Sequence, residues 1–293
     1  MWYNAVDLTM DLELQGKYDL IVHKALDLYL TADEASRNAV REFSEYVERH
    51  KEVCVIDSVE HMDVCASRQT FLTSLQTLLQ SNLPEFPYRI RTPWSYSLPS
   101  PSESVLPTVL SAMSSACVAF PMMVKTVDSA TSATSHLMYV VFDEEGLRTA
   151  LSCYQEPLLI QEYINHDATV YKIYVFGKRE MVAARESSGN LLPIPDLHYV
   201  RFYTNQPWPA ALKTLQTPII RDLPAQAVAY LSDLMRTYFK ISLFGYDVLR
   251  PAGGEDLVVI DLNYFPGYKE IKEMGEMMDE LVLETWGKFQ GGK

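Results

Sequence analysis

The stretch "VVIDLNYFPGY" (residues 258–268) combines a buried strand with polar side chains that such a strand seldom carries. Its first three residues are β-branched, which predicts a strand of the core. Asp261 and Asn263 interrupt the apolar run, and side chains two apart on a strand point to the same face. A Pro-Gly pair then ends the strand. We therefore treat the face that carries this carboxylate and this amide as a candidate site.

The preceding segment, "SLFGYDVLR" (242–250), carries a carboxylate of its own, Asp247. The connection "PAGGE" is glycine-rich, which predicts a hairpin with Asp247 on one arm and Asp261 on the other. Hard divalent cations prefer carboxylate and amide oxygens, and Mg²⁺ usually takes one or two carboxylates together with substrate phosphates. We expect Asp247, Asp261 and Asn263 to bind Mg²⁺.

Two lysines lie on other predicted strands: Lys125 ends "FPMMVK" and Lys172 interrupts "TVYKIYVF". Taken singly, each charged residue has a structural explanation, because strand lysines extend to solvent and strand aspartates occupy edges. Together, metal-binding carboxylates and lysines on separate strands indicate phosphoryl transfer, in which catalysis is mostly positioning and charge neutralisation. The sequence has neither the P-loop pattern GxxxxGK[ST] nor the catalytic-loop and DFG motifs of protein kinases.

The composition predicts a globular protein and limits its partners. Of the 293 residues, 48% are apolar, which is enough for a full core. The net charge of −13 argues against nucleic acid and anionic membranes as partners. No apolar run approaches the ~20 residues of a membrane span, and the start does not resemble a signal peptide. The four widely spaced cysteines read as reduced thiols. We expect a cytoplasmic monomer that acts on a small molecule.

The order of predicted elements divides the chain into three parts. Strands near 18–24 and 53–57 alternate with helices near 33–51 and 67–81, which is typical of a parallel α/β layer. Six prolines between residues 84 and 116 indicate a change of domain. Beyond them the pattern is α+β, with helices near 143–152 and 224–240 and strands near 120–126, 136–142, 157–164, 169–177, 180–187, 242–250 and 256–264. The expected domains are 1–88, 89–163 and 164–293.

From about residue 7 to about residue 285 the chain resembles the ATP-grasp fold. Within that fold it resembles the inositol 1,3,4-trisphosphate 5/6-kinases, also called inositol-tetrakisphosphate 1-kinases. Five blocks in the right order carry the resemblance: "YDLIVHKALD", "FPMMVKT…SH", "QEYINHDATVYKIYVFG", "SLFGYDVL" and "VIDLNYFPGY". The resemblance implies a small N-terminal α/β domain and two α+β subdomains that sandwich ATP. It also implies transfer of the γ-phosphoryl group of ATP to a hydroxyl of an inositol tris- or tetrakisphosphate, with Mg²⁺.

The resemblance also implies roles for individual residues. Expected at the nucleotide are Arg89, Lys125, Gln161, Glu162, Ile164, Lys172 and Ser187. Expected at the inositol phosphate are Lys24, His136, Lys172, Asn263 and Gly267. Asp247, Asp261 and Asn263 match the Mg²⁺ ligands, and Lys172, Arg185 and Asp261 are the candidate catalytic residues. His23 and His166 are expected to be structural.

Two departures from the family pattern keep other functions open. The loop between Lys125 and His136, "TVDSATSATS", lacks the glycine and the additional histidine that the family usually has there. Only about six residues precede the first matching segment, so the N-terminus is either naturally short or truncated. The alternatives are a non-catalytic inositol-phosphate or nucleotide binder and an ATP-grasp carboxylate-amine ligase. Retention of the metal ligands and of both lysines favours the kinase.

Overall fold

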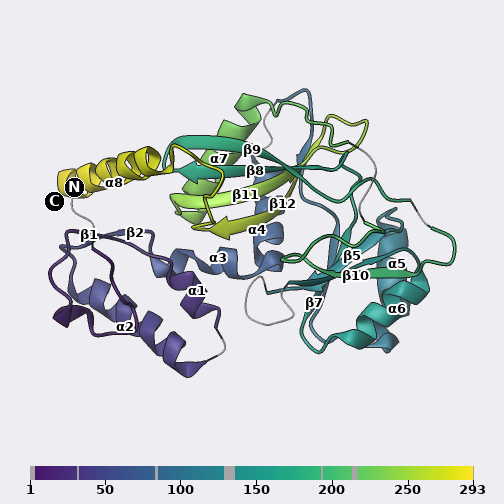
Figure 1. The fold of residues 1–293 in the computed structure, drawn as a ribbon, viewed down its shortest axis with the longest axis horizontal. Helices are drawn as coiled ribbons and strands as arrows, with labels where there is room; N and C mark the ends of the chain where they lie inside the picture. The colour runs from purple at the N-terminus through teal and green to yellow at the C-terminus, as the bar shows by residue number, and fades with distance from the viewer. Residues whose placement is uncertain are drawn as a thin grey trace.

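A computed structural model describes residues 4–31, 33–82, 85–128, 136–192, 194–212 and 217–292. Its N-terminal part has a parallel two-stranded sheet, at the lower left of Figure 1, and helices that extend from there to the centre of the molecule. The strands are β1 (Leu20–Val22) and β2 (Cys54–Ile56), and the α-helices are α1 (Ala25–Tyr29), α2 (Glu34–Arg49), α3 (Asp63–Ala66) and α4 (Arg68–Ser81). The predicted parallel α/β layer is thus present in this part of the chain.

The central sheet has five strands in the order β10-β6-β5-β7-β4. Its strands are β4 (Ser95–Leu98), β5 (Met122–Thr126), β6 (Leu137–Val141), β7 (Leu158–Glu162) and β10 (Tyr199–Tyr203), and its helices are α5 (Leu106–Ser115) and α6 (Glu144–Cys153). Side chains of both helices join strand residues such as Val124, Tyr139 and Ile160 in one core. This sheet lies at the right of Figure 1.

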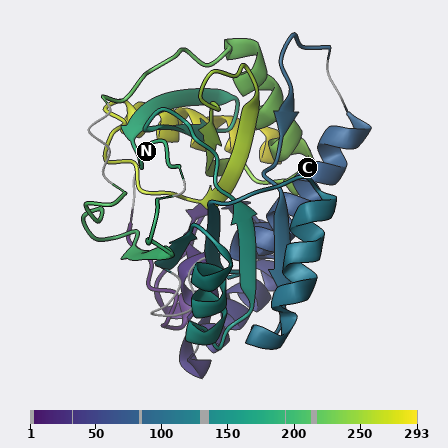
Figure 2. The same ribbon diagram turned by 90° about the vertical axis from the view of Figure 1, so that its right-hand side faces the viewer.

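The C-terminal sheet has five strands in the order β3-β12-β11-β8-β9. Its strands are β3 (Ile90–Arg91), β8 (Thr169–Phe176), β9 (Arg179–Glu186), β11 (Leu243–Leu249) and β12 (Leu257–Tyr264), and its helices are α7 (Ala225–Phe239) and α8 (Met274–Gly291). Figure 2 shows this sheet above the central one. The predicted hairpin is confirmed, since β11 and β12 pair antiparallel.

The two faces of the C-terminal sheet differ in what covers them. On one face, Ile173, Tyr246 and Val248 pack with α7 and with α4, which buries an apolar stripe of Phe71, Leu75, Leu78 and Leu79. The side chain of Ser67 caps α4 by accepting a hydrogen bond from the backbone N–H of Thr70. On the other face, Tyr174 and Phe176 pack with α8, and the rest of that face is left for the site.

Two strands cross the expected domain boundaries. β3 lies within 89–163 but pairs with β12, and β10 lies within 164–293 but pairs with β6. We keep the three-part division as a proposal in which these two strands tie neighbouring parts together. No helix of the described ranges is both long and apolar enough to cross a membrane.

Candidate active site

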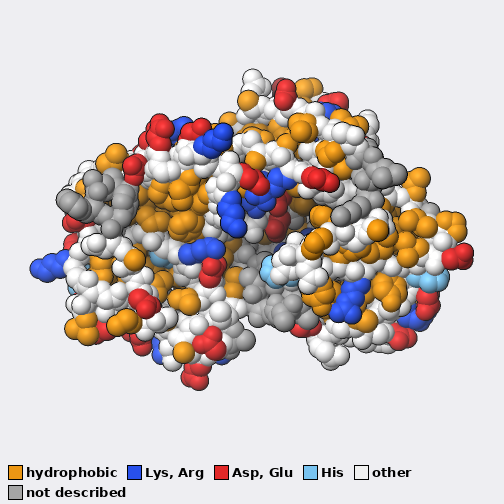
Figure 3. All heavy atoms as spheres, viewed as in Figure 1, with side chains coloured by type: hydrophobic (Ala, Val, Ile, Leu, Met, Phe, Trp, Pro, Cys, Tyr) orange, Lys and Arg blue, Asp and Glu red, His pale blue; other side chains and the backbone are white. Residues whose placement is uncertain are grey.

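A cavity of about 380 Å³ lies between the central and the C-terminal sheets. Residues of "FPMMVK", of the β7–β8 connection and of the β11–β12 hairpin line it together, although they are far apart in sequence. The residues predicted for the site that line this cavity are Lys125, His136, Gln161, Glu162, Ile164, Ser187, Asp247, Asp261 and Asn263. Figure 3 shows Lys and Arg side chains beside Asp and Glu side chains at the hollow between the three parts of the molecule.

The two carboxylates at the polar end of the cavity belong to one cross-strand row. Asp247 on β11 pairs with Lys172 on β8 and with Asp261 on β12, so the three side chains share a face. The register shifts after Asp247, whose neighbour Val248 pairs with Val259, so Ile260 is an extra residue in β12. Such a bulge re-aims side chains. Ile260 and Asp261, consecutive in sequence, consequently both line the cavity.

The carboxylates of this row lack sufficient protein partners. The Lys172 Nζ lies 3.5 Å from Asp247 Oδ1, which is buried without a hydrogen bond. Burial raises the pKa of Asp247 to about 6; Lys172 acts against this rise and the Asp261 carboxylate adds to it. The Nδ2 of Asn263 donates to Asp261 Oδ2 at 3.1 Å. Two adjacent carboxylates, one with an oxygen that accepts no hydrogen bond, and an amide oxygen fit Mg²⁺ when phosphates supply further ligands.

Lys125 faces this row from the central sheet. It is buried, and burial and the nearby guanidinium of Arg68 lower its pKa to about 8, against the pull of Asp261 and Asp247. Arg68 is also buried, and its NH1 donates to the carbonyls of Thr126 at 2.9 Å and of Asp128 at 2.8 Å. Two buried cations facing two carboxylates make a binding place for a polyanion with its metal ion.

The opposite end of the cavity is apolar on both sides. Alternation along β5 puts Met123 on the same face as Lys125, and both side chains line the cavity. The apolar lining comes from the central sheet through Met123, Met138 and Phe202, and from the C-terminal sheet through Val170, Leu249 and Ile260. A slot that is apolar on two faces at one end and charged at the other suits a planar base with a phosphate chain.

The end of β7 and the β7–β8 connection that follows it also line the cavity and offer hydrogen bonds. The Nε2 of Gln161 is buried in the cavity wall without a partner, so it is a free donor. The Glu162 carboxylate already accepts from the backbone N–H of Trp94 at 2.8 Å and from Arg91. The Glu162 carboxylate in the cavity wall is therefore already hydrogen-bonded to two protein groups.

Other predicted residues are not part of this lining, Lys172 among them, although it pairs with Asp247. Arg89 is exposed just before β3 and is not part of the lining. Arg185 lies on β9 and donates to Glu270 at 2.7 Å and to the Tyr174 hydroxyl at 2.6 Å. Lys24 and Gly267 line a second, open cavity of about 450 Å³ between the N-terminal part and the loop after β12. The loop residues 129–135, whose composition departs from the family, lie outside the described residues.

Sequence reasoning missed two basic side chains of the cavity lining, Arg68 and His166, and its apolar wall. Arg68 is the first residue of α4, and a bridge between Ser67 and Asp128 brings the start of this helix to the end of β5. An arginine at the first position of an amphipathic helix was the only local signal. His166 was expected to be structural, and it does bond within the connection, yet it also faces the cavity.

Sequence comparison agrees with this geometry. The pre-ATP-grasp domain of the inositol 1,3,4-trisphosphate 5/6-kinases matches residues 1–62, and their ATP-grasp domain matches residues 98–284. The chain belongs to this family. It is 28% identical over 281 residues to inositol-tetrakisphosphate 1-kinase of Xenopus laevis, covering 92% of this chain and 67% of that protein. It is 26% identical over 303 residues to inositol-tetrakisphosphate 1-kinase 1 of Arabidopsis thaliana, covering 95% and 85%.

Solved structures extend the comparison to the fold. The D-alanine–D-alanine ligase of Bacillus anthracis superposes with a TM-score of 0.57 at 15% identity, covering 97% of this chain and 86% of that chain. The ATP-grasp ligase PsnB, solved with a minimal precursor, Mg and ADP, gives a TM-score of 0.51 at 15% identity, covering 86% and 68%. The predicted α/β ATP-grasp fold is thus confirmed for this member of the inositol phosphate kinase family.

Proposed function

We propose that the protein is an ATP- and Mg²⁺-dependent kinase that transfers the γ-phosphoryl group to a hydroxyl of an inositol tris- or tetrakisphosphate. The observation that carries the proposal is the cross-strand row of Lys172, Asp247 and Asp261, whose two carboxylates line the same cavity as Lys125. Family membership and the apolar slot beside the row support the choice of nucleotide.

The proposed roles follow from position. Asp247, Asp261 and Asn263 hold Mg²⁺, which neutralises charge on the β- and γ-phosphates when it is bound. Lys125 and Arg68 bind phosphate oxygens from the central sheet. The ammonium group of Lys172 lies beside Asp247, where it can contact the transferred phosphoryl group. The transition state of phosphoryl transfer is loose, so orientation and cations supply much of the rate and a strong general base is not required.

The proposed binding place for the inositol phosphate is the side of the metal row that faces the N-terminal part. Lys24 and Gly267 line the open cavity there, and Asn263 follows Asp261 on β12 toward Gly267. The Arg185 side chain contacts Glu270 and the Tyr174 hydroxyl. His136 lies at the rim of the nucleotide cavity, where its Nδ1 is 3.0 Å from the Thr204 hydroxyl. We propose His136 as a further substrate contact from that rim.

The proposed setting is the cytoplasm, and the proposed working form is a monomer. None of the four cysteines, all within the described residues, forms a disulfide, which suits a reducing compartment. Sedimentation of the purified protein at working concentration tests the monomer.

Product analysis separates the kinase from its alternatives. The protein is incubated with Mg-ATP and a panel of inositol phosphates, and the products are resolved by chromatography. A more highly phosphorylated inositol supports the kinase. Binding of both ligands without turnover would establish a degenerate binder instead. ATP consumption only in the presence of a carboxylate and an amine would establish a ligase.

A further inference from the structure

His166 and Ser187 form a hydrogen-bonded pair in the wall of the nucleotide cavity. Both lie beside Ile164 and Val170, at the apolar end of the cavity, and their side chains join the β7–β8 connection to the segment after β9. His166 is buried, so its ring has little freedom to change partners.

The partners of the imidazole fix its tautomer. Its Nδ1 lies 2.6 Å from the carbonyl oxygen of Ile164, and a carbonyl only accepts, so Nδ1 carries the proton. Burial lowers the pKa of His166, which keeps the ring neutral and leaves Nε2 as an acceptor. The Ser187 hydroxyl lies 2.9 Å from Nε2 and must therefore donate to it. The Ser187 oxygen is left with lone pairs only.

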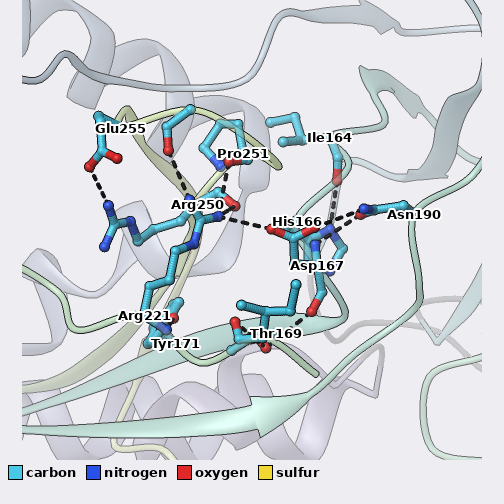
Figure 4. A network of polar contacts seen from close by, with 12 residues as sticks. Ile164, His166, Asp167, Thr169, Tyr171, Asn190, Arg221, Arg250, Pro251 and Glu255 are labelled. Carbon is cyan, nitrogen blue, oxygen red and sulfur yellow. Dashed lines mark hydrogen bonds and ion pairs between the residues drawn. The ribbon is translucent and has the colours of Figure 1, made fainter. Parts of the chain in front are cut away.

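The backbone around the pair is held in place. The N–H of Ser187 donates to the Ala168 carbonyl at 2.9 Å, and the Tyr163 hydroxyl bonds Ser188 and the Gly189 carbonyl, each at 2.7 Å. Behind the connection, Asp167 accepts from Asn190 at 2.8 Å and from Arg221 at 3.2 Å (Figure 4). Rotation of the Ser187 hydroxyl is therefore the main freedom left, and His166 restricts it.

We propose that His166 is a positioning residue that makes Ser187 a dedicated hydrogen-bond acceptor for the nucleoside of the bound nucleotide. This inference rests on the proposed function only in assuming that a nucleotide occupies this cavity. The donors that an adenine nucleoside offers are the exocyclic amino group and the ribose hydroxyls. Inosine has a carbonyl in place of that amino group. Its carbonyl oxygen would face the Ser187 oxygen, and two acceptors without a proton between them weaken binding.

Calorimetry with the full chain tests the pair without any need for turnover. Binding of Mg-ATP, Mg-ITP, and the 2′-deoxy and 3′-deoxy forms of Mg-ATP is measured for wild type, Ser187→Ala, His166→Leu and the double variant. We expect each single variant to weaken ATP binding about fivefold, the loss that corresponds to one neutral hydrogen bond. The double variant should lose no more than either single one, because both changes remove the same interaction.

The analogues identify the donor. A selective loss with Mg-ITP that disappears in Ser187→Ala identifies the base amino group, and the same behaviour with a deoxy analogue identifies a ribose hydroxyl. His166→Gln, whose amide oxygen can accept from Ser187, should restore part of the affinity. The control is His198→Leu, since His198 is exposed, bonds Asp143 and lies outside the cavity lining; it should bind ATP as wild type does.

Two results would overturn the proposal: additive losses in the double variant, or wild-type ATP affinity in a folded His166→Leu protein. Should that variant fail to fold, equal effects of Ser187→Ala on ATP and on all three analogues would overturn it as well. Failure of the proposed function is a separate result, namely ATP binding without any phosphorylated inositol product.

Discussion

Asp261 links the other two proposed metal ligands, because it neighbours Asp247 across the strand pair and accepts a hydrogen bond from Asn263. It is half-buried on a bulged strand, so its removal changes charge more than packing. We expect Asp261→Ala to lower kcat at least about a hundredfold while the melting temperature stays close to that of wild type. The measurement is inositol phosphate turnover alongside thermal unfolding.

The matched control for Asp261→Ala is Asp233→Ala, which removes an exposed carboxylate from α7 at its ion pair with Arg236. This variant should retain full turnover, because exposed ion pairs contribute little to stability. Near-wild-type activity in Asp261→Ala would refute the metal assignment.

Titration of Lys125 should make the activity depend on pH. Its pKa is lowered to about 8, so the free enzyme carries this cation below that pH and loses it above. The ammonium attracts the phosphates, so kcat/KM for ATP should fall as the pH rises through about 8, since this ratio reports ionisations of the free enzyme. The measurement is a pH profile at saturating inositol phosphate.

Lys125→Arg serves as the comparison, because a guanidinium stays charged throughout this range. Whatever its absolute rate, its profile should lack the fall near pH 8. A wild-type profile that parallels the Lys125→Arg profile would show that Lys125 is not the titrating group.

At the scale of elements, Gly245 on β11 lets two parts of the site approach each other. A Cβ at this position would lie 3.0 Å from Pro266 Cγ, 3.1 Å from the Ile173 carbonyl oxygen and 3.7 Å from Lys172 Cε. The carbonyl belongs to a sheet and cannot move freely. We expect Gly245→Ala to lower the free energy of unfolding by about 1–3 kcal/mol and to reduce kcat by displacing the Lys172 stem.

Gly287 in α8 is the control position, since a Cβ there meets nothing within 4 Å. Gly287→Ala should raise the free energy of unfolding by about 0.5–1 kcal/mol, because alanine favours the helix. Chemical denaturation measures both variants. Equal stability of Gly245→Ala and wild type would mean that the strand adjusts to the added methyl group.

Elements with strong local signals were predictable from the sequence. The β11–β12 hairpin was found because β-branched runs flank a glycine-rich turn, and the polar pair on one face of β12 pointed to the site. α5 was missed because prolines dominate its surroundings, although a proline in the first turn is compatible with a helix. β10 was missed because its pairing with β6 is a long-range contact.

The same distinction applies to the site. Asp247, Asp261 and Lys172 are charged residues in apolar strands, and such residues stand out locally. Arg68 lines the cavity because the start of α4 packs at the end of β5. Arg89, which the sequence placed at the nucleotide, is exposed. Which of these two arginines lines the cavity depends on tertiary packing, which no local sequence pattern shows.

At the scale of the whole molecule, Asp57 joins the N-terminal part to the C-terminal sheet. Its Oδ2 accepts from the backbone N–H groups of Ser242 at 2.7 Å and Leu243 at 3.1 Å. Its own N–H donates to the Tyr264 hydroxyl at 2.8 Å, and its carbonyl lies 2.7 Å from Nε2 of His23. Lys24 follows His23, so the contact fixes the distance between Lys24 and the loop after β12.

Removing the Asp57 carboxylate should therefore lower the free energy of unfolding and raise KM for the inositol phosphate, but not KM for ATP. Asp57→Ala leaves two N–H groups without an acceptor, and we expect a loss of about 2–4 kcal/mol in the free energy of unfolding. KM for the inositol phosphate should rise because Lys24 and Gly267 lose their fixed separation. KM for ATP should stay near the wild-type value, because the nucleotide cavity lies between the other two sheets.

Asp57→Asn separates the contact from its charge. The asparagine oxygen can still accept from Ser242 and Leu243, so this variant should recover most of the stability and the wild-type KM for the inositol phosphate. Steady-state kinetics with each substrate varied in turn, together with denaturation, measures these effects. If Asp57→Ala raised both KM values equally, the contact would be stabilising the whole fold, and the N-terminal part would have no separate role in placing the inositol phosphate.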